Sequence, residues 1–129
     1  MRKNSGCKKD QVLPHFTLHA LWPIYRGICT DSTKKFDSNK IKDIQPRMEK
    51  YWPNIEDLAD IDMHTNFWKH EWKVHGTRCN IYHVHSYFSE SLFLLDAIGK
   101  YVEETLGTAG ITLLCPSFLY DFSYDLTHH

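Results

Sequence analysis

The sequence predicts one compact domain of the α+β class, spanning residues 1–129. Three observations lead to this expectation. A chain of 129 residues with 42% hydrophobic composition can bury one core but hardly two. Residues 15–22 alternate and are rich in β-forming side chains, as in a strand. Residues 86–106 repeat apolar side chains at helical spacing. With no internal repeat, an early strand followed by helices defines the class.

The strand expected over HFTLHALW (15–22) should stop at Pro23, because proline cannot donate a hydrogen bond to a neighbouring strand. Residues 25–39 contain Gly27 and a cluster of polar side chains, which is typical of a loop.

A helix is expected from residue 40 to Trp52, where apolar residues recur at helical spacing. Either Ser38 or Asn39 is placed to cap its start. Pro46 falls inside the pattern, so the helix either begins near this residue or is kinked there. Pro53 ends the segment.

A second helix is expected through FWKHEWKVH (67–75), with Thr65 or Asn66 as its cap and Gly76 as its end. Residues 80–88 alternate like a short strand or turn. Residues 86–106 form the clearest helical region, although Gly99 is a possible break in it. Glycines 107 and 110 are expected to end this helix. Its apolar stripe consists of Phe88, Leu92, Leu95, Ile98, Val102 and Leu106. The tail, residues 111–129, is apolar and aromatic without a clear period.

Charge excludes one class of function. The chain has 15 basic and 16 acidic residues, unlike proteins that grip duplex DNA through a strongly basic face. Nine histidines would make it cationic near pH ~5, so it can bind a polyanion in an acidic compartment. The chain contains no run of eighteen or more apolar residues, so we expect no membrane span. MRKNSGCKKD has no apolar stretch behind it and does not resemble a signal peptide.

The four cysteines, Cys7, Cys29, Cys79 and Cys115, include no C-x-x-C pair. This argues against a zinc ribbon or a thioredoxin-like motif. The wide spacing fits disulfides better than free thiols, but the spacing alone assigns no pairs.

The stretch FWKHEWKVHGTRC (67–79) concentrates groups that can carry chemistry. It invites comparison with the zinc motif H-E-x-x-H, in which two histidines four residues apart share one ion. Here His70 and His75 are five residues apart, about 140° around a regular helix. One ion is not easily held by both, so a metal-dependent hydrolase ranks behind the other hypotheses.

Glu71 and His75 are four residues apart and share one helix face. A carboxylate beside an imidazole stabilises its protonated form and orients its ring, as an acid–base group requires. His19 is the candidate for a second proton-transfer group, because it interrupts an otherwise apolar strand. Taken singly, His19 is more typical of a structural histidine, and residues 67–75 of an amphipathic helix.

The two segments together resemble a known family. FTLHALWP (16–23) followed by FWKHEWKVHG (67–76) is similar to the two active-site segments of the ribonuclease T2 family. The usual forms are close to FTIHGLWP and FWxHEWxKHGTC. The resemblance covers about residues 7–111, and parts of it look like the plant acid ribonucleases. Residues 112–129 have no counterpart.

The resemblance implies an antiparallel sheet packed with helices, incomplete here because family members extend beyond both ends of this chain. It also implies an endoribonuclease that cleaves single-stranded RNA through a 2′,3′-cyclic phosphate, with no metal or other cofactor. DNA would be refused because it lacks the 2′-hydroxyl nucleophile. We expect a monomer. The family is extracellular or vacuolar, whereas this chain shows no signal peptide.

By similarity, His75 is the base acting on the 2′-hydroxyl and His19 the acid protonating the leaving oxygen. His70 would bind the phosphate, and Glu71 would assist in the charged transition state. Trp22 and Phe67 match positions of the family associated with base binding. The resemblance also implies a disulfide between Cys29 and Cys79, and leaves Cys7 and Cys115 without partners. Trp68 and Trp72 are assigned mainly to the core.

Several positions depart from the family pattern. Val74 stands where a lysine normally precedes the second-segment histidine, so a cation that would stabilise the phosphorane is missing. Arg78 is inserted before Cys79, where it can shift the disulfide or supply a substitute cation. Ala20 replaces a glycine, and Ile24 stands where aspartate is common. These departures keep a second hypothesis open: a catalytically impaired homologue that binds RNA or serves as a recognition module.

Overall fold

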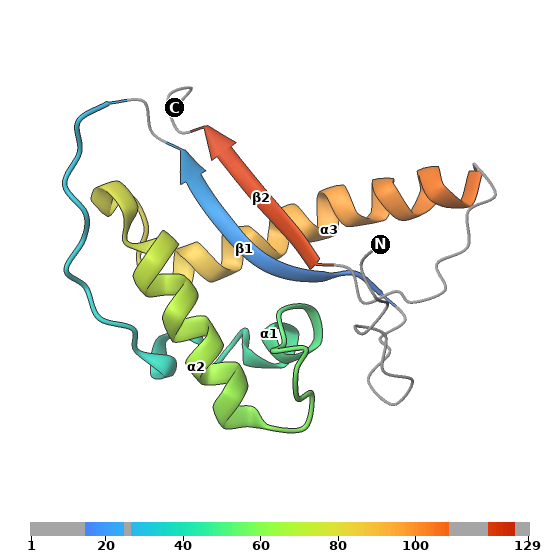
Figure 1. Ribbon diagram of the computed structural model, residues 1–129, viewed down its shortest axis with the longest axis horizontal. Coiled ribbons are helices and arrows are strands. Elements are labelled where there is room, and N and C mark those ends of the chain that lie inside the picture. Colours follow the sequence, from blue (N-terminus) through green and yellow to red (C-terminus); the bar gives the residue numbers. More distant parts are fainter. Residues whose placement is uncertain (1–14, 25–26, 109–118, 126–129) are drawn as a thin grey trace, which may run out of the picture.

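The structure, a computed structural model, describes residues 15–24, 27–108 and 119–125. The expected α+β class is confirmed. Strand β1 contacts α1, η3 and α3, and thus lies at the centre of the described part (Figure 1). The elements in chain order are β1 (Thr17–Ile24), the 3₁₀ helix η2 (Ser38–Ile41), α1 (Gln45–Tyr51), α2 (Ile61–Glu71), the π-helix η3 (Trp72–Gly76), the 3₁₀ helix η4 (Arg78–Asn80), α3 (Val84–Thr108) and β2 (Leu119–Asp125).

The two described strands pair in parallel, from Thr17 opposite Leu119 to Ile24 opposite Asp125 (Figure 1). The antiparallel arrangement expected from the resemblance is therefore wrong for this pair. Every described helix lies between β1 and β2 in the sequence, so the chain crosses the molecule before it returns in the same direction. Parallel pairs require a long crossover of this kind. The tail, in which the sequence showed no period, supplies the second strand.

β1 runs through Pro23 and ends at Ile24, one residue beyond the expected stop. Proline is tolerated in a strand that leaves one edge without a strand partner. In the described part of the chain, β1 pairs with β2 alone. Its other edge is contacted by side chains from the helices, so the missing N–H of Pro23 does not interrupt a ladder.

The expected helix after residue 40 divides at Pro46. Helix α1 begins at Gln45 with this proline in its first turn, where its missing N–H costs no hydrogen bond. A separate 3₁₀ turn, η2, precedes it. The cap of η2 is Asp37, whose Oδ1 accepts the backbone N–H of Asn39 at 3.0 Å. The expectation of a cap at Ser38 or Asn39 was wrong by one residue.

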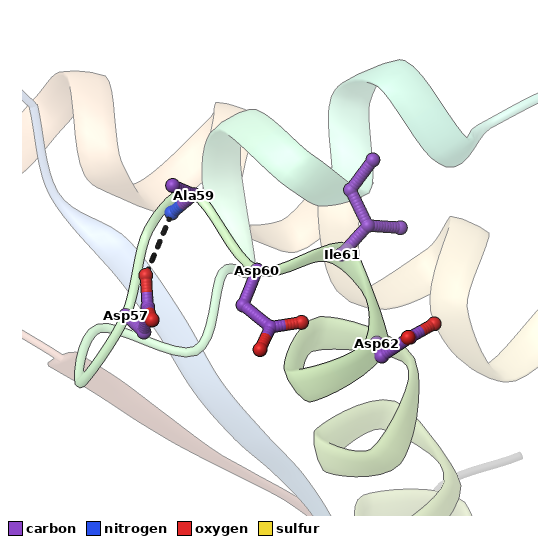
Figure 2. A pocket seen from close by; sticks show the side chains of 5 residues that line it. All are labelled: Asp57, Ala59, Asp60, Ile61 and Asp62. Atoms are coloured by element: carbon purple, nitrogen blue, oxygen red, sulfur yellow. Dashed lines mark hydrogen bonds between the residues drawn. The ribbon is translucent and has the colours of Figure 1, made fainter.

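Helix α2 begins six residues before the expected segment. Asp60 caps it by accepting the backbone N–H of Met63 at 3.2 Å. The expected cap at Thr65 or Asn66 is therefore wrong, because both residues lie inside the helix, where Thr65 donates to the carbonyl of Ile61. The acidic residues around the cap surround an open pocket of about 430 Å³ (Figure 2). Within it, Asp57 accepts the backbone N–H of Ala59, so its carboxylate serves the turn before α2.

Helix α3 is continuous from Val84 to Thr108, and Gly99 does not divide it. It includes residues 84–88, so the strand or turn expected over residues 80–88 is wrong for most of that segment. Gly99 is buried, and a Cβ there would lie 3.6 Å from Leu95, an ordinary contact. Ile98, expected in the apolar stripe, is exposed because the buried line continues through Gly99. Gly107 lies inside the helix, and Gly110 lies outside the described residues.

Three buried tryptophans form the centre of the core, and each indole N–H donates to a backbone carbonyl. Trp68 donates to Trp52 at 2.6 Å, and Trp52 donates to His19 at 2.8 Å. Trp72 donates to Lys34 at 2.9 Å. A buried indole N–H without a partner would be costly, so these bonds fix where the rings can lie. The core assignment of Trp68 and Trp72 is confirmed, since both are fully buried.

A buried histidine ties α2 to the loop before it. His64 Nδ1 accepts the backbone N–H of Asn54 at 2.8 Å, which leaves Nε2 as the donor to the carbonyl of Leu58 at 3.1 Å. This neutral tautomer satisfies both ring nitrogens. The role of this histidine is therefore structural.

No described helix is both long enough and apolar enough to cross a bilayer. The longest, α3, carries charged residues along its length. Cys7 and Cys115 lie outside the described residues.

Tyr87 provides a test of how β1 is held. Its buried hydroxyl donates to the carbonyl of Leu21 at 2.9 Å. Burial, and secondly the charge of Glu71, raise the pKa of Tyr87 well above its usual value. At pH 7 we expect Tyr87→Phe to cost about 1–3 kcal/mol, because the buried Leu21 carbonyl loses its donor.

The stabilisation provided by Tyr87 should also depend on pH, in a direction that follows from its raised pKa. Because the pKa of Tyr87 is raised in the folded state, the stabilisation is complete below about pH 10 and declines above it, by up to about 1.4 kcal/mol per pH unit. Urea unfolding from pH 7 to 11 should therefore show the difference between parent and variant shrinking above pH 10. Tyr101→Phe, at an exposed position of α3, is the matched control and should change little. A difference that stays constant with pH would contradict this account.

Candidate active site

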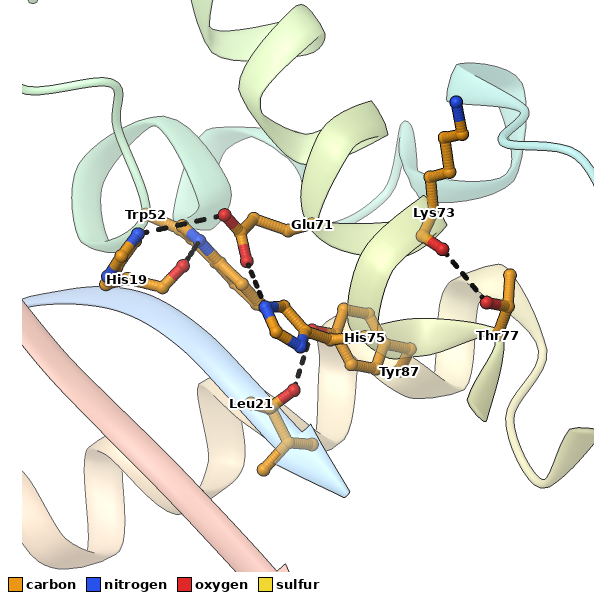
Figure 3. A network of polar contacts seen from close by, with 8 residues as sticks. All are labelled: His19, Leu21, Trp52, Glu71, Lys73, His75, Thr77 and Tyr87. Atoms are coloured by element: carbon orange, nitrogen blue, oxygen red, sulfur yellow. Dashed lines mark hydrogen bonds and ion pairs between the residues drawn. The ribbon is translucent and has the colours of Figure 1, made fainter. Parts of the chain in front are cut away.

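The site is organised around one buried carboxylate, Glu71, at the end of α2. It is 3% exposed. His19 Nε2 lies 3.8 Å from its Oε1, and His75 Nε2 lies 3.6 Å from its Oε2 (Figure 3). Both distances are longer than a hydrogen bond but within the range of an ion pair. Two imidazoles from segments more than fifty residues apart thus share one carboxylate, with their side chains 38% and 23% exposed.

A bulge in β1 aims His19. The pairing of β1 with β2 shifts between Leu18 and Ala20, so His19 is an extra residue in the strand. In a regular strand Leu18 and Leu21, three residues apart, would point to opposite faces. Both are fully buried in the same core cluster. The bulge resets the alternation, and His19 is left half-buried at the surface of the core, facing Glu71 (Figure 3).

The backbone at the bulge and just after it is held by side-chain donors from the core. The carbonyl of His19 accepts from Trp52, and that of Leu21 accepts from Tyr87 (Figure 3). Both donors come from the core rather than from a neighbouring strand. The position of the His19 ring therefore depends on the packing of two aromatic side chains beneath it.

Each imidazole lies against an aromatic ring. His19 stacks with Phe67 at a centroid distance of 5.8 Å, and His75 stacks with Trp22 at 5.2 Å. Trp22 is 43% exposed, in contrast to the three core tryptophans. The two residues expected to bind bases thus lie beside the two histidines.

A π-helical turn carries His75. In η3 the N–H of Thr77 donates to the carbonyl of Trp72, five residues earlier, at 3.1 Å. π-turns of this kind often occur at functional sites. Gly76 ends the turn, as expected. A Cβ at this position would collide with the ring of Trp72, so the close approach of the indole requires glycine.

His70 is not brought into this cluster. It is exposed on α2, and no described residue joins it by a hydrogen bond, ion pair or ring stack. Lys73 also points away from Glu71 (Figure 3). Val74 is 42% exposed, and Arg78 is exposed in η4. Ala20 is fully buried and is not among the non-glycine residues with positive φ, so the replacement of glycine imposes no backbone strain.

Cys29 and Cys79 form a disulfide, with Cα atoms 5.0 Å apart. The inserted Arg78 does not displace it. Cys79 and Asn80 adopt φ values of 58° and 50°, and this left-handed turn accommodates the extra residue. Asp31 stabilises the turn by accepting the N–H of Cys79 at 3.1 Å. These three side chains, Cys29, Asp31 and Cys79, bring possible ligand atoms within 4.8 Å of one another, but both sulfurs are bonded to each other.

The sequence is related to known ribonucleases. The family model described as "Ribonuclease T2 family" matches residues 2–118. "Ribonuclease T2" of Sus scrofa is 33% identical over 119 residues, which cover 88% of this chain and 56% of the relative. "Ribonuclease T2" of Danio rerio is 34% identical over 96 residues, covering 71% and 37%. "Ribonuclease 1" of Arabidopsis thaliana is 37% identical over 86 residues, covering 61% and 36%.

Each match spans less than two thirds of the relative's own length. Animal and plant proteins match at similar identity, so the expected likeness to plant members in particular is not confirmed. No solved structure matches the chain.

The disulfide leads to a stability prediction. It closes a loop of 50 residues, for which the chain-entropy model gives about 4 kcal/mol at 25 °C. We expect the double variant Cys29→Ala, Cys79→Ala to lose most of this amount in urea unfolding. Each single variant should lose about as much as the double, because either one breaks the same bond. Single variants that each cost half of the double would show that the two sulfurs act separately.

Proposed function

This chain belongs to the ribonuclease T2 family, and on that premise we propose that it is an endoribonuclease that cleaves single-stranded RNA by acid–base transesterification. One observation carries the proposal: His19 and His75 approach opposite oxygens of the same buried carboxylate (Figure 3). The reaction needs one group to accept a proton and another to donate one. An imidazole is the side chain best suited to both roles near neutral and mildly acidic pH.

His75 acts as the base in this proposal. It removes the proton of the 2′-hydroxyl, whose oxygen then attacks the adjacent phosphorus and forms a P–O2′ bond. His19, in its protonated form, gives its proton to the 5′-oxygen as the P–O5′ bond breaks. The products are a 2′,3′-cyclic phosphate and a free 5′-hydroxyl. His75 ends protonated and His19 neutral, so charge and protons balance across the step.

Glu71 supports this exchange by its charge. During the reaction the positive charge passes from His19 to His75, and a carboxylate close to both stabilises an imidazolium on either side. Because Glu71 is buried, its field is screened less than that of a surface carboxylate. It also favours one orientation of each ring. Glu71 therefore assists the transition state without itself transferring the proton.

His70 is proposed to contact the phosphate. It precedes Glu71 on α2 and is exposed, so it is accessible to an oxygen of a bound strand. Trp22 and Phe67 are proposed to stack on bases on either side of the scissile bond, each contributing about 1–3 kcal/mol. Their placement beside the two histidines supports these roles, because bases flank the reacting phosphate.

Single-stranded RNA is the proposed substrate, and DNA is excluded because it has no 2′-hydroxyl. We propose that a monomer works in an acidic, oxidising compartment, either extracellular or vacuolar. The disulfide supports this location, since such bonds persist mainly in oxidising compartments.

A second function remains in view because of Val74. A hydrophobic residue, 42% exposed, follows Lys73 and precedes the proposed base, where family members carry a lysine. A homologue that binds RNA but cleaves it slowly, or that serves as a recognition module, fits this substitution. RNA binding that survives His19→Ala, together with no cleavage by the parent, would favour this alternative.

The catalytic roles are tested by single substitutions. We expect the parent to cleave single-stranded RNA in EDTA at about pH 5 and to leave 2′,3′-cyclic ends. His19→Ala and His75→Ala should each lower kcat by about 10²- to 10⁴-fold, because each removes one positioned proton-transfer group. His85→Ala is the matched control, since His85 pairs with Asp43 away from Glu71. A folded parent that produces no cyclic ends would refute the proposal. Activity lost in EDTA and restored by zinc would favour a metal-dependent hydrolase.

Substitutions at position 74 test whether a positive charge beside His75 would raise kcat. We expect Val74→Lys to raise kcat, by up to about 10²- to 10³-fold, because a positive charge beside His75 can stabilise the phosphorane. Val74→Gln is the control, since it adds a long polar side chain without charge. An equal gain from both variants would attribute the effect to polarity rather than to charge.

A further inference from the structure

A cleft of about 490 Å³ lies against the C-terminal part of α2 and η3, apart from the catalytic carboxylate. One wall is the extended segment 32–36, and the other is formed by α2 and η3. The buried ring of Trp72 lies between them. Most of the lining side chains carry a hydroxyl or an ammonium group, and two are aromatic. The lining residues are Ser32, Thr33, Lys34, Lys35, Phe36, Lys69, Trp72, Lys73 and Thr77.

The charge of this cleft is one-sided. Four of its lining side chains are exposed lysines, and none of its lining residues is acidic: Lys34, Lys35, Lys69 and Lys73. Asp31 and Asp37 flank the segment in sequence but are not among the lining residues, and they accept backbone N–H groups at Cys79 and Asn39. The ammonium group of Lys34 also donates to His83 Nδ1 at 3.1 Å. Like charges gathered around one concavity destabilise the empty protein, whereas a bound anion would neutralise them.

The two walls are fixed to each other. The N–H of Ser32 donates to the carbonyl of Thr77 at 2.7 Å, and Trp72 donates to the carbonyl of Lys34 at 2.9 Å. The disulfide closes the same end. The cleft is therefore formed before any ligand arrives, which lowers the cost of binding.

The cleft and the catalytic cluster share one helical segment. Lys69 and Lys73 are four residues apart and line the cleft, and Glu71 lies between them in sequence but points the other way (Figure 3). Within α2, His70 lies between Lys69 and Glu71 around the axis, at roughly 100° per residue. An extended strand leaving the catalytic cluster can thus pass His70 and reach the two lysines.

We propose that this four-lysine cleft binds the phosphodiester backbone of the RNA strand beyond the scissile phosphate. Its ammonium groups neutralise phosphate oxygens, and the hydroxyl groups of Ser32 and Thr33 are suitable donors to phosphate or ribose, whereas that of Thr77 already donates to the carbonyl of Lys73. The assignment of RNA as the occupant rests on the proposed function. The one-sided charge and the continuity past His70 favour a strand over an isolated ion.

The test compares two variants of equal net charge, both made in the chain of residues 1–129. The cleft variant replaces its four lysines by glutamine: Lys34, Lys35, Lys69 and Lys73. The control variant replaces four exposed lysines elsewhere: Lys40, Lys42, Lys50 and Lys100. Each variant lowers the formal charge from −1 by four, so a general effect of net charge would appear in both. Urea unfolding establishes that both are folded.

Binding is measured with a 2′-O-methyl oligonucleotide of about twelve nucleotides, which cannot be cleaved because its 2′-oxygen is blocked. We expect the cleft variant to raise Kd by at least about tenfold at low salt, and to flatten the plot of log Kd against log salt by about 0.7 for each lost phosphate contact. The control variant should change neither quantity by a comparable amount. Cleavage of a dinucleotide should be the same in parent and cleft variant, because a dinucleotide does not reach the cleft.

The outcomes separate this proposal from the catalytic one. A parent that does not cleave the dinucleotide would overturn the proposed function, while oligonucleotide binding would still report on the cleft. Equal Kd and salt slope in parent and cleft variant would overturn the cleft proposal, as would an equal loss in the control. The cleft proposal would also be overturned if the cleft variant lost binding of inorganic phosphate or polyglutamate but bound the oligonucleotide with the Kd of the parent.

Discussion

The site depends on how one edge of β1 is held. A strand edge without a partner strand presents backbone carbonyls that need donors. Here Trp52 and Tyr87 supply them, at His19 and Leu21 respectively. Trp52 is in turn held through its own carbonyl by Trp68 of α2. The helix that carries Glu71 therefore fixes, through two indoles, the backbone of the strand that carries His19. A shift in this aromatic core would move one histidine relative to the carboxylate.

Burying Glu71 opposes stability. A carboxylate removed from water costs several kcal/mol unless other groups compensate for it. Two imidazoles at 3.6 and 3.8 Å provide part of that compensation, more so when they are protonated. The charge also reaches Tyr87, where it contributes to the raised pKa of the phenol. Above about pH 10, where a free phenol would ionise, the raised pKa keeps the hydroxyl protonated and donating to the Leu21 carbonyl.

Local patterns in the sequence predicted the elements that depend on neighbours along the chain. The β-rich run of β1, the start of α1 at Pro46, the Glu71–His75 pair and the end at Gly76 follow from short-range geometry. The N-cap at Asp60 was missed because the polar start of α2 has a weak apolar period, although an aspartate three residues before Met63 was a usable signal. The pairing of β1 with β2, the bulge at His19 and the indole bonds join residues far apart in sequence. No local pattern encodes them. The approach of His19 to Glu71 was expected only through resemblance to a family.

The segment from Phe67 to Thr77 shows why a single helix can serve several purposes. Its fully buried side, Trp68 and Trp72, is fixed by indole bonds to two other segments. The other two sides of the segment carry opposite charges. One presents a buried carboxylate to two histidines, and the other presents Lys69 and Lys73 to solvent. The α-to-π change after Glu71 alters the angular spacing of the following side chains, so Val74 cannot be placed by counting along a regular helix. Lys73 does not take the place of the lysine that family members carry at position 74, because its side chain points away from Glu71 (Figure 3).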